Sequence, residues 1–285
     1  MIVTDKKYSM DAKYVSKLDL MVKRMEGTDD NILLIDGDEG QGKTEKAIGT
    51  CYYISYKMGR KYDVNNIFFE LDQVINFAST TEQQIIHFDE GALGLQSTQW
   101  WNKNQQKFLT LCMVARKKKH FIVICIPKFY KLSQYITEER SIGLVHVYSR
   151  KNMQKGRFCY FTKKAKEKLI QQWKRKKVKT YKKFHSFHGS FVQASKKVFT
   201  PEEMEVYEKN KDQAIMNVCA DNSTISSAQE RYITQRNLLI KYIVEEKGLS
   251  FRKAEKFMES IGVNIKKDQI LKIIKEIAPI QPPLA

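Results

Sequence analysis

A glycine-rich octapeptide, Gly-Asp-Glu-Gly-Gln-Gly-Lys-Thr at residues 37–44, directly follows a short apolar run at residues 31–36. The apolar run does not alternate with polar residues, which is typical of a strand buried on both faces of a parallel sheet. The octapeptide fits the pattern Gly-x-x-x-x-Gly-Lys-Thr, in which a loop between a strand and a helix surrounds phosphate groups with backbone amides. This order of strand, loop and helix restricts the chain to an α/β fold built around a phosphate-binding loop.

The residues of this loop have distinct chemical tasks. Its glycines allow the backbone amides to turn inward, Lys43 reaches the terminal phosphates, and Thr44 binds Mg²⁺. We therefore predict ATP and Mg²⁺ as cofactors. The predicted nucleotide-binding residues are Gly37, Gly40, Gln41, Gly42, Lys43, Thr44 and Asp89, with Thr44 and Asp89 as metal ligands.

Two adjacent acids, Asp89 and Glu90, end a second apolar run. Hydrolysis of a nucleoside triphosphate requires a carboxylate that holds Mg²⁺ and a group that orients the attacking water. Asp89 is predicted to take the first role and Glu90 the second. An acid in the second position favours an ATPase over a nucleotide kinase or a GTPase. His87 alternates with apolar residues in the same run, and we interpret it as a core histidine.

Strands alternate with helices over the first half of the chain, which predicts a mostly parallel sheet covered by helices. The predicted fold class is α/β, a RecA-like P-loop NTPase domain of the ASCE type. The predicted strands are 31–36, 66–70, 84–89 and 121–126, followed by an antiparallel pair at 144–148 and 157–161.

The chain is predicted to contain four segments. They are a lead-in helix at residues 1–30, a P-loop ATPase domain with a basic C-terminal helix at 31–178, a connector at 179–228, and a helical domain at 229–285.

Two helix signals lie outside the predicted ATPase domain. In the lead-in, residues 9–25 carry an apolar stripe that includes Leu20. In the connector, Thr200, Pro201 and Glu203 predict a helix start, with threonine as the N-cap, proline in the first turn and glutamate reaching back. Trp100 and Trp101 begin a predicted helix within the domain, where they either line a pore or pack that helix.

The formal net charge of +18 favours a polyanionic partner. Residues 150–184 contain 15 lysines and arginines against a single acid, Glu167. Aromatic residues that could stack on bases are interleaved with these cations. They are Phe158, Tyr160, Phe161, Trp173, Tyr181 and Phe184. We predict DNA as the partner, although a solvated helix face is the alternative. The predicted contacts in this segment are Lys163, Lys164, Lys174, Arg175, Lys176 and Lys177.

The C-terminal region resembles a helix-turn-helix unit. Ser250 is a predicted N-cap, Gly262 permits a tight turn, and Lys266 and Lys267 lie near the groove-facing side of the last predicted helix. Small three-helix units also dock proteins, so a protein partner is the alternative to DNA.

The five cysteines lack the spacing of a zinc site or a disulfide framework, which predicts a reducing, cytoplasmic compartment. The N-terminus has no signal-peptide pattern, and no apolar run approaches the about 18 residues of a membrane span.

The order of these elements resembles the FtsK/HerA superfamily of DNA-pumping ATPases. That group includes conjugative coupling proteins, zonular occludens toxin-like phage assembly ATPases and viral genome-packaging ATPases. The resemblance covers residues 30–162, and it includes the P-loop, the pair Asp89 and Glu90, Arg116 at the end of a helix, and Arg140 before a strand.

In that superfamily an arginine at the position of Arg116 or Arg140 reaches ATP held by the adjacent subunit. The resemblance therefore implies a homo-oligomer, a hexameric ring, as the active form. Pro127 and Lys128 depart from the superfamily, which usually has a polar sensor after this strand.

These observations predict an ATP-hydrolysing DNA motor or DNA-processing ATPase, of the translocation or packaging type, from a virus or mobile element. Its predicted catalytic residues are Glu90, Lys43, Arg116 and Arg140. Two alternatives are an ATP-switched, DNA-binding replication initiator or loader, and an ATPase that drives virion or secretion assembly.

Overall fold

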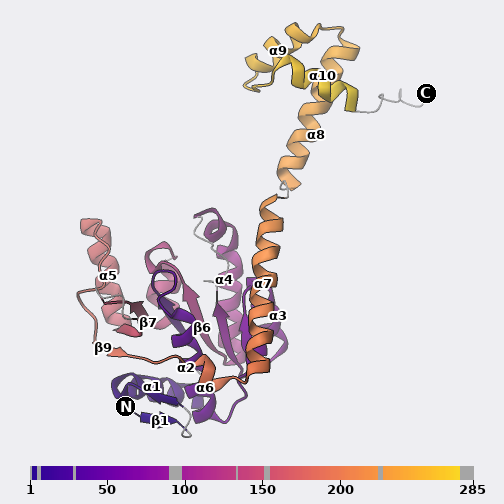
Figure 1. Ribbon diagram of the computed structural model, residues 1–285. Helices are drawn as coiled ribbons and strands as arrows, with labels where there is room; N and C mark the ends of the chain where they lie inside the picture. Colours follow the sequence, from indigo (N-terminus) through magenta and orange to yellow (C-terminus); the bar gives the residue numbers. More distant parts are fainter. Residues whose placement is uncertain are drawn as a thin grey trace. The chain divides into compact units, whose positions relative to one another are not determined.

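The computed structural model describes residues 2–4, 8–27, 30–89, 98–132, 134–150, 155–223 and 227–276. The chain forms two compact units, Met1–Val218 and Cys219–Ala285. Their elements are labelled in Figure 1.

The first unit is built around a seven-stranded sheet with the order β4-β5-β6-β3-β7-β8-β9. The first five strands in this order, β4, β5, β6, β3 and β7, are parallel to one another. Strand β8 is antiparallel to β7, and β9 is antiparallel to β8. A separate pair is formed by β1 and β2. The strands are β1 (Ile2–Thr4), β2 (Tyr8–Met10), β3 (Asn31–Asp36), β4 (Ile67–Phe68), β5 (Ile85–Asp89), β6 (Phe121–Ile126), β7 (Ser141–Tyr148), β8 (Arg157–Thr162) and β9 (Phe187–Ser190).

Helices cover both faces of this sheet (Figure 1). In the first unit they are α1 (Ala12–Glu26), α2 (Lys43–Met58), η1 (Val64–Asn66), α3 (Leu71–Thr80), α4 (Thr98–Lys118), η3 (Phe129–Lys131), η4 (Tyr135–Arg140), α5 (Lys163–Lys176), α6 (Ser195–Val198) and, as far as Val218, α7 (Pro201–Ser223). The mostly parallel, helix-covered sheet confirms the predicted RecA-like P-loop fold class.

Strand β3 explains why residues 32–35, the middle of the run at 31–36, are all apolar. Leu33 and Ile35 pack into a core with α1 and α2, whereas Ile32 and Leu34 pack into a second core with α3, α4 and α5. Successive side chains of a strand point to opposite faces, so the middle of a strand covered on both faces is apolar at successive positions.

The lead-in helix is shorter than predicted and belongs to the first unit. Helix α1 begins at Ala12 because residues 8–10 pair with β1, and the Asp11 side chain accepts a hydrogen bond (3.2 Å) from the Tyr14 amide. The Tyr14 hydroxyl then bonds Thr50 of α2 at 2.9 Å. The assignment of Leu20 to the buried stripe was wrong, since its side chain is exposed.

The segment predicted as a connector, residues 179–228, contains β9, α6 and the whole of α7, and the first compact unit extends to Val218, past the predicted end of the ATPase domain at 178. Helix α7 starts as predicted: the Thr200 amide donates to the Glu203 carboxylate (2.9 Å), and the Glu203 amide donates to the Thr200 hydroxyl (3.3 Å). Its contact with the core is narrow, because Tyr207 and Ala214, two turns apart, are its buried apolar residues among those described.

The prediction that the aromatic residues of the basic segment stack on bases is mostly wrong. Phe158, Tyr160 and Phe161 are buried. They lie in β8, and both faces of this strand pack into a core: Phe158 and Tyr160 into the core that contains α1 and α2, and Phe161 into the core that contains α3, α4 and α5. Trp173 and Tyr181 pack partly against the core, and Phe184 is exposed.

The second unit is helical. Its described elements are α8 (Ser227–Lys241), η5 (Tyr242–Glu246), α9 (Phe251–Ser260) and α10 (Lys267–Glu276). They share a small core that includes Ile243, Met258 and Ile270. The helices break as predicted at Gly248 and Gly262, both of which have positive φ angles.

Ser250 occupies the N-cap position of α9, but its side chain makes no capping hydrogen bond. Among the described residues of the whole chain, no helix combines the length and apolar character needed to cross a bilayer.

Candidate functional site

The phosphate-binding loop joins β3 to α2 in a tightly confined space. A Cβ atom at Gly37, where φ is +151°, would lie 2.4 Å from the carbonyl oxygen of Val147 in β7. Gly42 has φ +95°, and its missing Cβ would lie 3.3 Å from the Phe191 ring. Glycine is therefore required at both positions by backbone conformation and by the neighbouring atoms.

Lys43, the predicted phosphate-binding lysine, is held over the start of the loop. Its Nζ donates hydrogen bonds to the carbonyl oxygens of Gly37 (2.8 Å) and Asp38 (3.0 Å). The side chain of Gln41 accepts a hydrogen bond from the Ser149 hydroxyl, which ties the middle of the loop to the end of β7. The loop is thus held in shape by its own lysine and by Ser149.

The structure brings the two predicted metal ligands together. The Thr44 hydroxyl donates a hydrogen bond of 2.7 Å to Oδ2 of Asp89. This bond crosses β6, which lies between the strand that leads into the loop and the strand that carries Asp89. Asp89 is 1% exposed, and its Oδ1 atom is buried without a hydrogen-bond partner among the described residues.

This geometry fits a magnesium ion. Mg²⁺ prefers oxygen ligands and is commonly bound through one or two carboxylates together with nucleotide phosphates. The Thr44 hydroxyl and the unpaired Oδ1 of Asp89 supply such oxygens at the first turn of α2. An uncompensated buried carboxylate oxygen is otherwise costly, which a cation would relieve.

Three predictions fall on residues or side chains outside the described part of the chain. They concern Glu90, Trp100 and Trp101. The role of Glu90 in orienting water and the fate of the two tryptophans therefore stay predictions.

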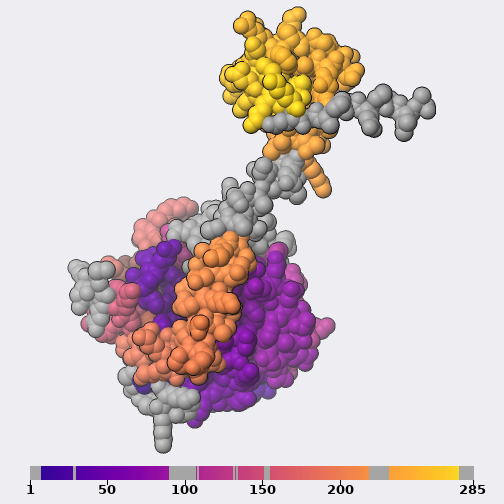
Figure 2. All heavy atoms as spheres, turned by 45° about the vertical axis from the view of Figure 1, so that its right-hand side comes forward, coloured from indigo at the N-terminus to yellow at the C-terminus, as the bar shows by residue number. Residues whose placement is uncertain are grey.

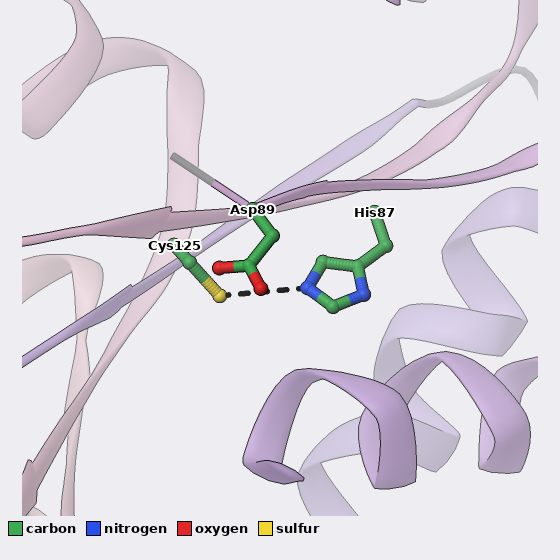
Figure 3. A group of neighbouring side chains, drawn as sticks. All are labelled: His87, Asp89 and Cys125. Atoms are coloured by element: carbon green, nitrogen blue, oxygen red, sulfur yellow. Dashed lines mark hydrogen bonds between the residues drawn. The ribbon is translucent and has the colours of Figure 1, made fainter. Parts of the chain in front are cut away.

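His87 is a core histidine, as the sequence suggested. Its Nδ1 lies 3.2 Å from the Tyr62 hydroxyl and its Nε2 lies 3.6 Å from Sγ of Cys125 (Figure 3). Burial lowers the pKa of His87 to about 4, against an opposing effect of Asp89, so the ring is neutral at pH 7.

The ligand atoms of His87, Asp89 and Cys125 lie within 4.8 Å of one another, and all three residues are buried (Figure 3). Imidazole and thiolate are ligands of softer metals than Mg²⁺. The oxygens of Thr44 and Asp89 are therefore the better match to a nucleotide-bound Mg²⁺.

A segment far along the chain packs against the loop and the residues next to it, and the sequence analysis did not predict this contact. We call residues 191–207 the strap. Glu45, next to Thr44, accepts hydrogen bonds from the Ala194 amide (2.7 Å), the Ser195 amide (2.9 Å) and the Ser195 hydroxyl (2.7 Å). At the other end of the strap, the Tyr207 hydroxyl donates to Oδ2 of Asp89 at 3.3 Å.

The strap includes the first residues of helix α7. This helix runs along the surface of the first unit (orange in Figure 2). The contacts of the strap with Glu45 and Asp89 join residues more than 100 positions apart, and α7 has no strong apolar pattern of its own. Thr200 and Glu203 signalled the start of this helix, but no local signal indicated where it docks.

The end of the basic segment is anchored beside the loop. Asp36, the last residue of β3, is buried and binds His146 Nδ1 (2.9 Å), the Phe129 amide (3.3 Å) and the Tyr181 hydroxyl. The Tyr181 and His146 rings stack with centroids 3.6 Å apart. The cations from Lys174 onward are therefore tied to the same end of the sheet as the loop.

The predicted DNA-contacting lysines and arginine of this segment, from Lys163 to Lys177, are exposed. Lys174 also bonds the Gln134 side chain at 3.1 Å. In the second unit Lys266 is exposed and pairs with Glu255 (3.5 Å), and Lys267 is half-buried at the start of α10.

The two candidate arginines both lie at the amino ends of the parallel strands, away from the loop. Arg140 donates hydrogen bonds to Asp30 (2.6 Å) and to the carbonyl oxygen of Cys112 (2.8 Å), and both partners of its ion pair are largely buried. Arg116, in the last turn of α4, is exposed. The structure thus gives Arg140 an internal partner and leaves Arg116 accessible.

No protein-family model matches the chain, and no curated protein matches it. Two solved structures of RuvB from Thermotoga maritima are similar over most of their length. One, described as a Holliday junction branch migration motor, has 11% identity and a TM-score of 0.31, and the alignment covers 93% of this chain and 86% of that one. The other, an arginine-to-alanine variant of RuvB, has 11% identity, a TM-score of 0.31 and coverages of 95% and 87%.

Similarity at this level does not assign a function. Neither comparison identifies the FtsK/HerA superfamily, so the expected membership of that superfamily is not supported. The sheet order and the loop that follows β3 place the chain in the broader class of P-loop NTPases.

Proposed function

We propose that this protein hydrolyses ATP and uses the energy to process DNA, as a homo-oligomer of a virus or mobile element. The observation that carries the proposal is the contact between Thr44 and Asp89, with one buried carboxylate oxygen of Asp89 left unpaired among the described residues. Together with the preformed loop, it supplies the ligands that a magnesium-bound nucleoside triphosphate requires.

The chain's own residues divide the work of hydrolysis. When nucleotide binds, the Lys43 ammonium group would give up its hydrogen bonds to the two loop carbonyl oxygens and donate to phosphate oxygens. It would then stabilise the negative charge of the transferred phosphoryl group. Thr44 and Asp89 would hold Mg²⁺, which, when bound, neutralises charge that develops on the phosphates. Glu90, next to Asp89 in the sequence, would orient the attacking water.

An arginine from a neighbouring subunit would complete the site. Arg116 is the better candidate of the two, because it is exposed, whereas Arg140 is already paired with Asp30. A residue that must reach another subunit's nucleotide needs an accessible guanidinium group.

DNA is the proposed load because an exposed cationic stretch is anchored next to the loop. The residues from Lys174 to Lys183 carry a strong positive charge, and Tyr181 fixes them to Asp36. Cations of this density bind a phosphate backbone and release counterions. Translocation or packaging of DNA is the specific activity we propose.

One observation favours an alternative, an ATP-switched DNA-binding protein. Helix α7 contacts Asp89 through Tyr207 and continues along the chain into the second unit. A nucleotide-dependent change at Asp89 could therefore set the DNA affinity of the second unit without movement of DNA.

The test is the ATPase rate with and without DNA for the wild type, Glu90→Gln and Lys43→Ala. A motor should hydrolyse ATP faster on DNA, Glu90→Gln should retain nucleotide binding and lose hydrolysis, and Lys43→Ala should lose both. Slow turnover with nucleotide-dependent DNA affinity would support the switch. No hydrolysis by the wild type under any condition would overturn the proposed motor.

A further inference from the structure

We propose that Tyr207 is a positioning residue for Asp89, so that the strap and α7 help to build the metal site. The inference rests on the proposed function, because it concerns the carboxylate that we expect to hold Mg²⁺. It adds to that site a residue 118 positions away in the sequence.

The hydrogen bonds of Asp89 are asymmetric. Its Oδ2 atom accepts two of them, from Thr44 at 2.7 Å and from Tyr207 at 3.3 Å, whereas Oδ1 accepts none from the described residues. Two donors on one oxygen fix the rotation of the carboxylate and direct the other oxygen to a different ligand. Tyr207 therefore helps to keep Oδ1 available for a cation or for its water.

The Tyr207 ring is held in place without its hydroxyl. The side chain is 5% exposed, and its ring centroid lies 5.5 Å from that of Phe69. Burial, followed by the charge of Asp89, raises the pKa of Tyr207, so the hydroxyl remains a protonated donor. Replacement by phenylalanine should therefore remove the hydrogen bond and keep the packing.

The strap fixes the start of α7 relative to the loop. Phe191 lies against Gly42, and the carboxylate of Glu45 binds Ala194 and Ser195. These contacts lie on either side of Lys43 and Thr44 in the sequence. The position of Tyr207 is thus coupled to the residues that surround the phosphates and the metal.

The experiment compares Tyr207→Phe with a matched control, Tyr62→Phe. Tyr62 is also buried and its hydroxyl bonds His87, which lies on the same strand as Asp89. For each variant, the affinity for a fluorescent ATP analogue is measured over a Mg²⁺ titration and in EDTA. The thermal unfolding midpoint without ligands is measured in parallel.

Tyr207→Phe should raise the Mg²⁺ concentration at half-maximal nucleotide binding by about tenfold, the effect of removing one hydrogen bond to a charged group. Binding in EDTA should stay unchanged, and Tyr62→Phe should bind Mg²⁺ as the wild type does. An unchanged Mg²⁺ requirement in Tyr207→Phe would overturn the proposal, as would an equal loss of binding in EDTA.

The two proposals can fail separately. Wild-type protein that binds Mg²⁺ and nucleotide in a Tyr207-dependent way but never hydrolyses ATP would reject the proposed reaction and retain the role of Tyr207. Normal hydrolysis with the same Mg²⁺ requirement in Tyr207→Phe would reject the role of Tyr207 alone.

Discussion

Ser195 donates two hydrogen bonds to the carboxylate of Glu45, one from its amide at 2.9 Å and one from its hydroxyl at 2.7 Å. These residues lie 150 positions apart, and Glu45 directly follows Thr44. The first turn of the loop's helix is therefore attached to the segment that ends in Tyr207.

This attachment should contribute to stability. Glu45→Ala removes a charged acceptor from three donors, and we expect the free energy of unfolding to fall by about 2 kcal/mol. Ser195→Ala should cost about half as much, because it removes the hydroxyl bond alone. Urea unfolding measures both, with Glu205→Ala on the exposed face of α7 as the control. Equal stability of Glu45→Ala and the control would contradict the prediction.

Substitution of Arg140 should lower the stability of the protein, whereas substitution of Arg116 should lower its ATPase activity. Arg140→Ala leaves Asp30 buried without its ion pair, so it should lower the free energy of unfolding by about 3 kcal/mol. Arg116→Ala should change stability by less than about 0.5 kcal/mol, as is usual for exposed side chains. The rate of ATP hydrolysis by Arg116→Ala should fall about a thousandfold, which is the lower end of the range of rate enhancement by an arginine from a neighbouring subunit.

A mixing experiment tests whether Arg116 acts between subunits. Arg116→Ala and Lys43→Ala proteins are each assayed alone and then as a mixture. Partial recovery of ATP hydrolysis in the mixture is expected, because some interfaces combine an intact loop with an intact arginine. No recovery in a mixture shown to form mixed oligomers would argue against the role in trans.

His87 should make the fold sensitive to acid. Its pKa is about 4 in the folded protein and near the ordinary 6.5 when unfolded, so between these values the unfolded state binds the extra proton. Stability should thus be constant above pH 6.5 as far as His87 is concerned. It should fall by up to about 1.4 kcal/mol for each pH unit below that.

The measurement is urea unfolding at pH 7 and at pH 5 for wild type and His87→Gln. Burial also lowers the pKa of His120, so the wild-type slope contains both histidines. The variant should show a weaker pH dependence than the wild type. Identical slopes would mean that His87 titrates normally in the folded protein.

Salt dependence should identify the DNA-binding surface. Combined alanine substitution at Lys174, Arg175, Lys176 and Lys177 should weaken binding to duplex DNA. It should also reduce the slope of log affinity against log salt by about 0.9 for each phosphate that these side chains neutralise in the wild type. Lys266→Ala combined with Lys267→Ala tests the second unit in the same titration. An unchanged slope in the first variant would exclude residues 174–177 as a phosphate-binding surface.

The parts of the fold that follow local patterns could be predicted from the sequence. The apolar run at 31–36, the loop and Asp89 indicated the sheet and the proximity of Thr44 to Asp89, because a buried parallel strand and a phosphate loop each depend on neighbouring residues in the chain. The helix start at Thr200 and Glu203 could be predicted for the same reason.

Features that depend on distant contacts could not be predicted. Phe158 and Phe161 lie among cations in the sequence, but helices on the two faces of the sheet bury them: the Phe158 ring lies 5.2 Å from that of Tyr14 in α1, and Phe161 belongs to the core that includes Leu169 of α5. Arg140 precedes a strand, as an arginine that acts in trans would, but Asp30 lies beside it. Tyr207 lies in a polar helix, and nothing in the neighbouring sequence indicates that its hydroxyl reaches Asp89.

The strap has a consequence for the order of events during synthesis. Asp89 and Tyr207 are separated by 118 residues, and Glu45 and Ser195 by 150, so these contacts have a high sequence separation. A nascent chain that has reached residue 178 already contains the loop and Asp89 but has neither strap contact. Since chains are made from the N-terminus, the nucleotide site can be completed only after α7 begins to emerge from the ribosome.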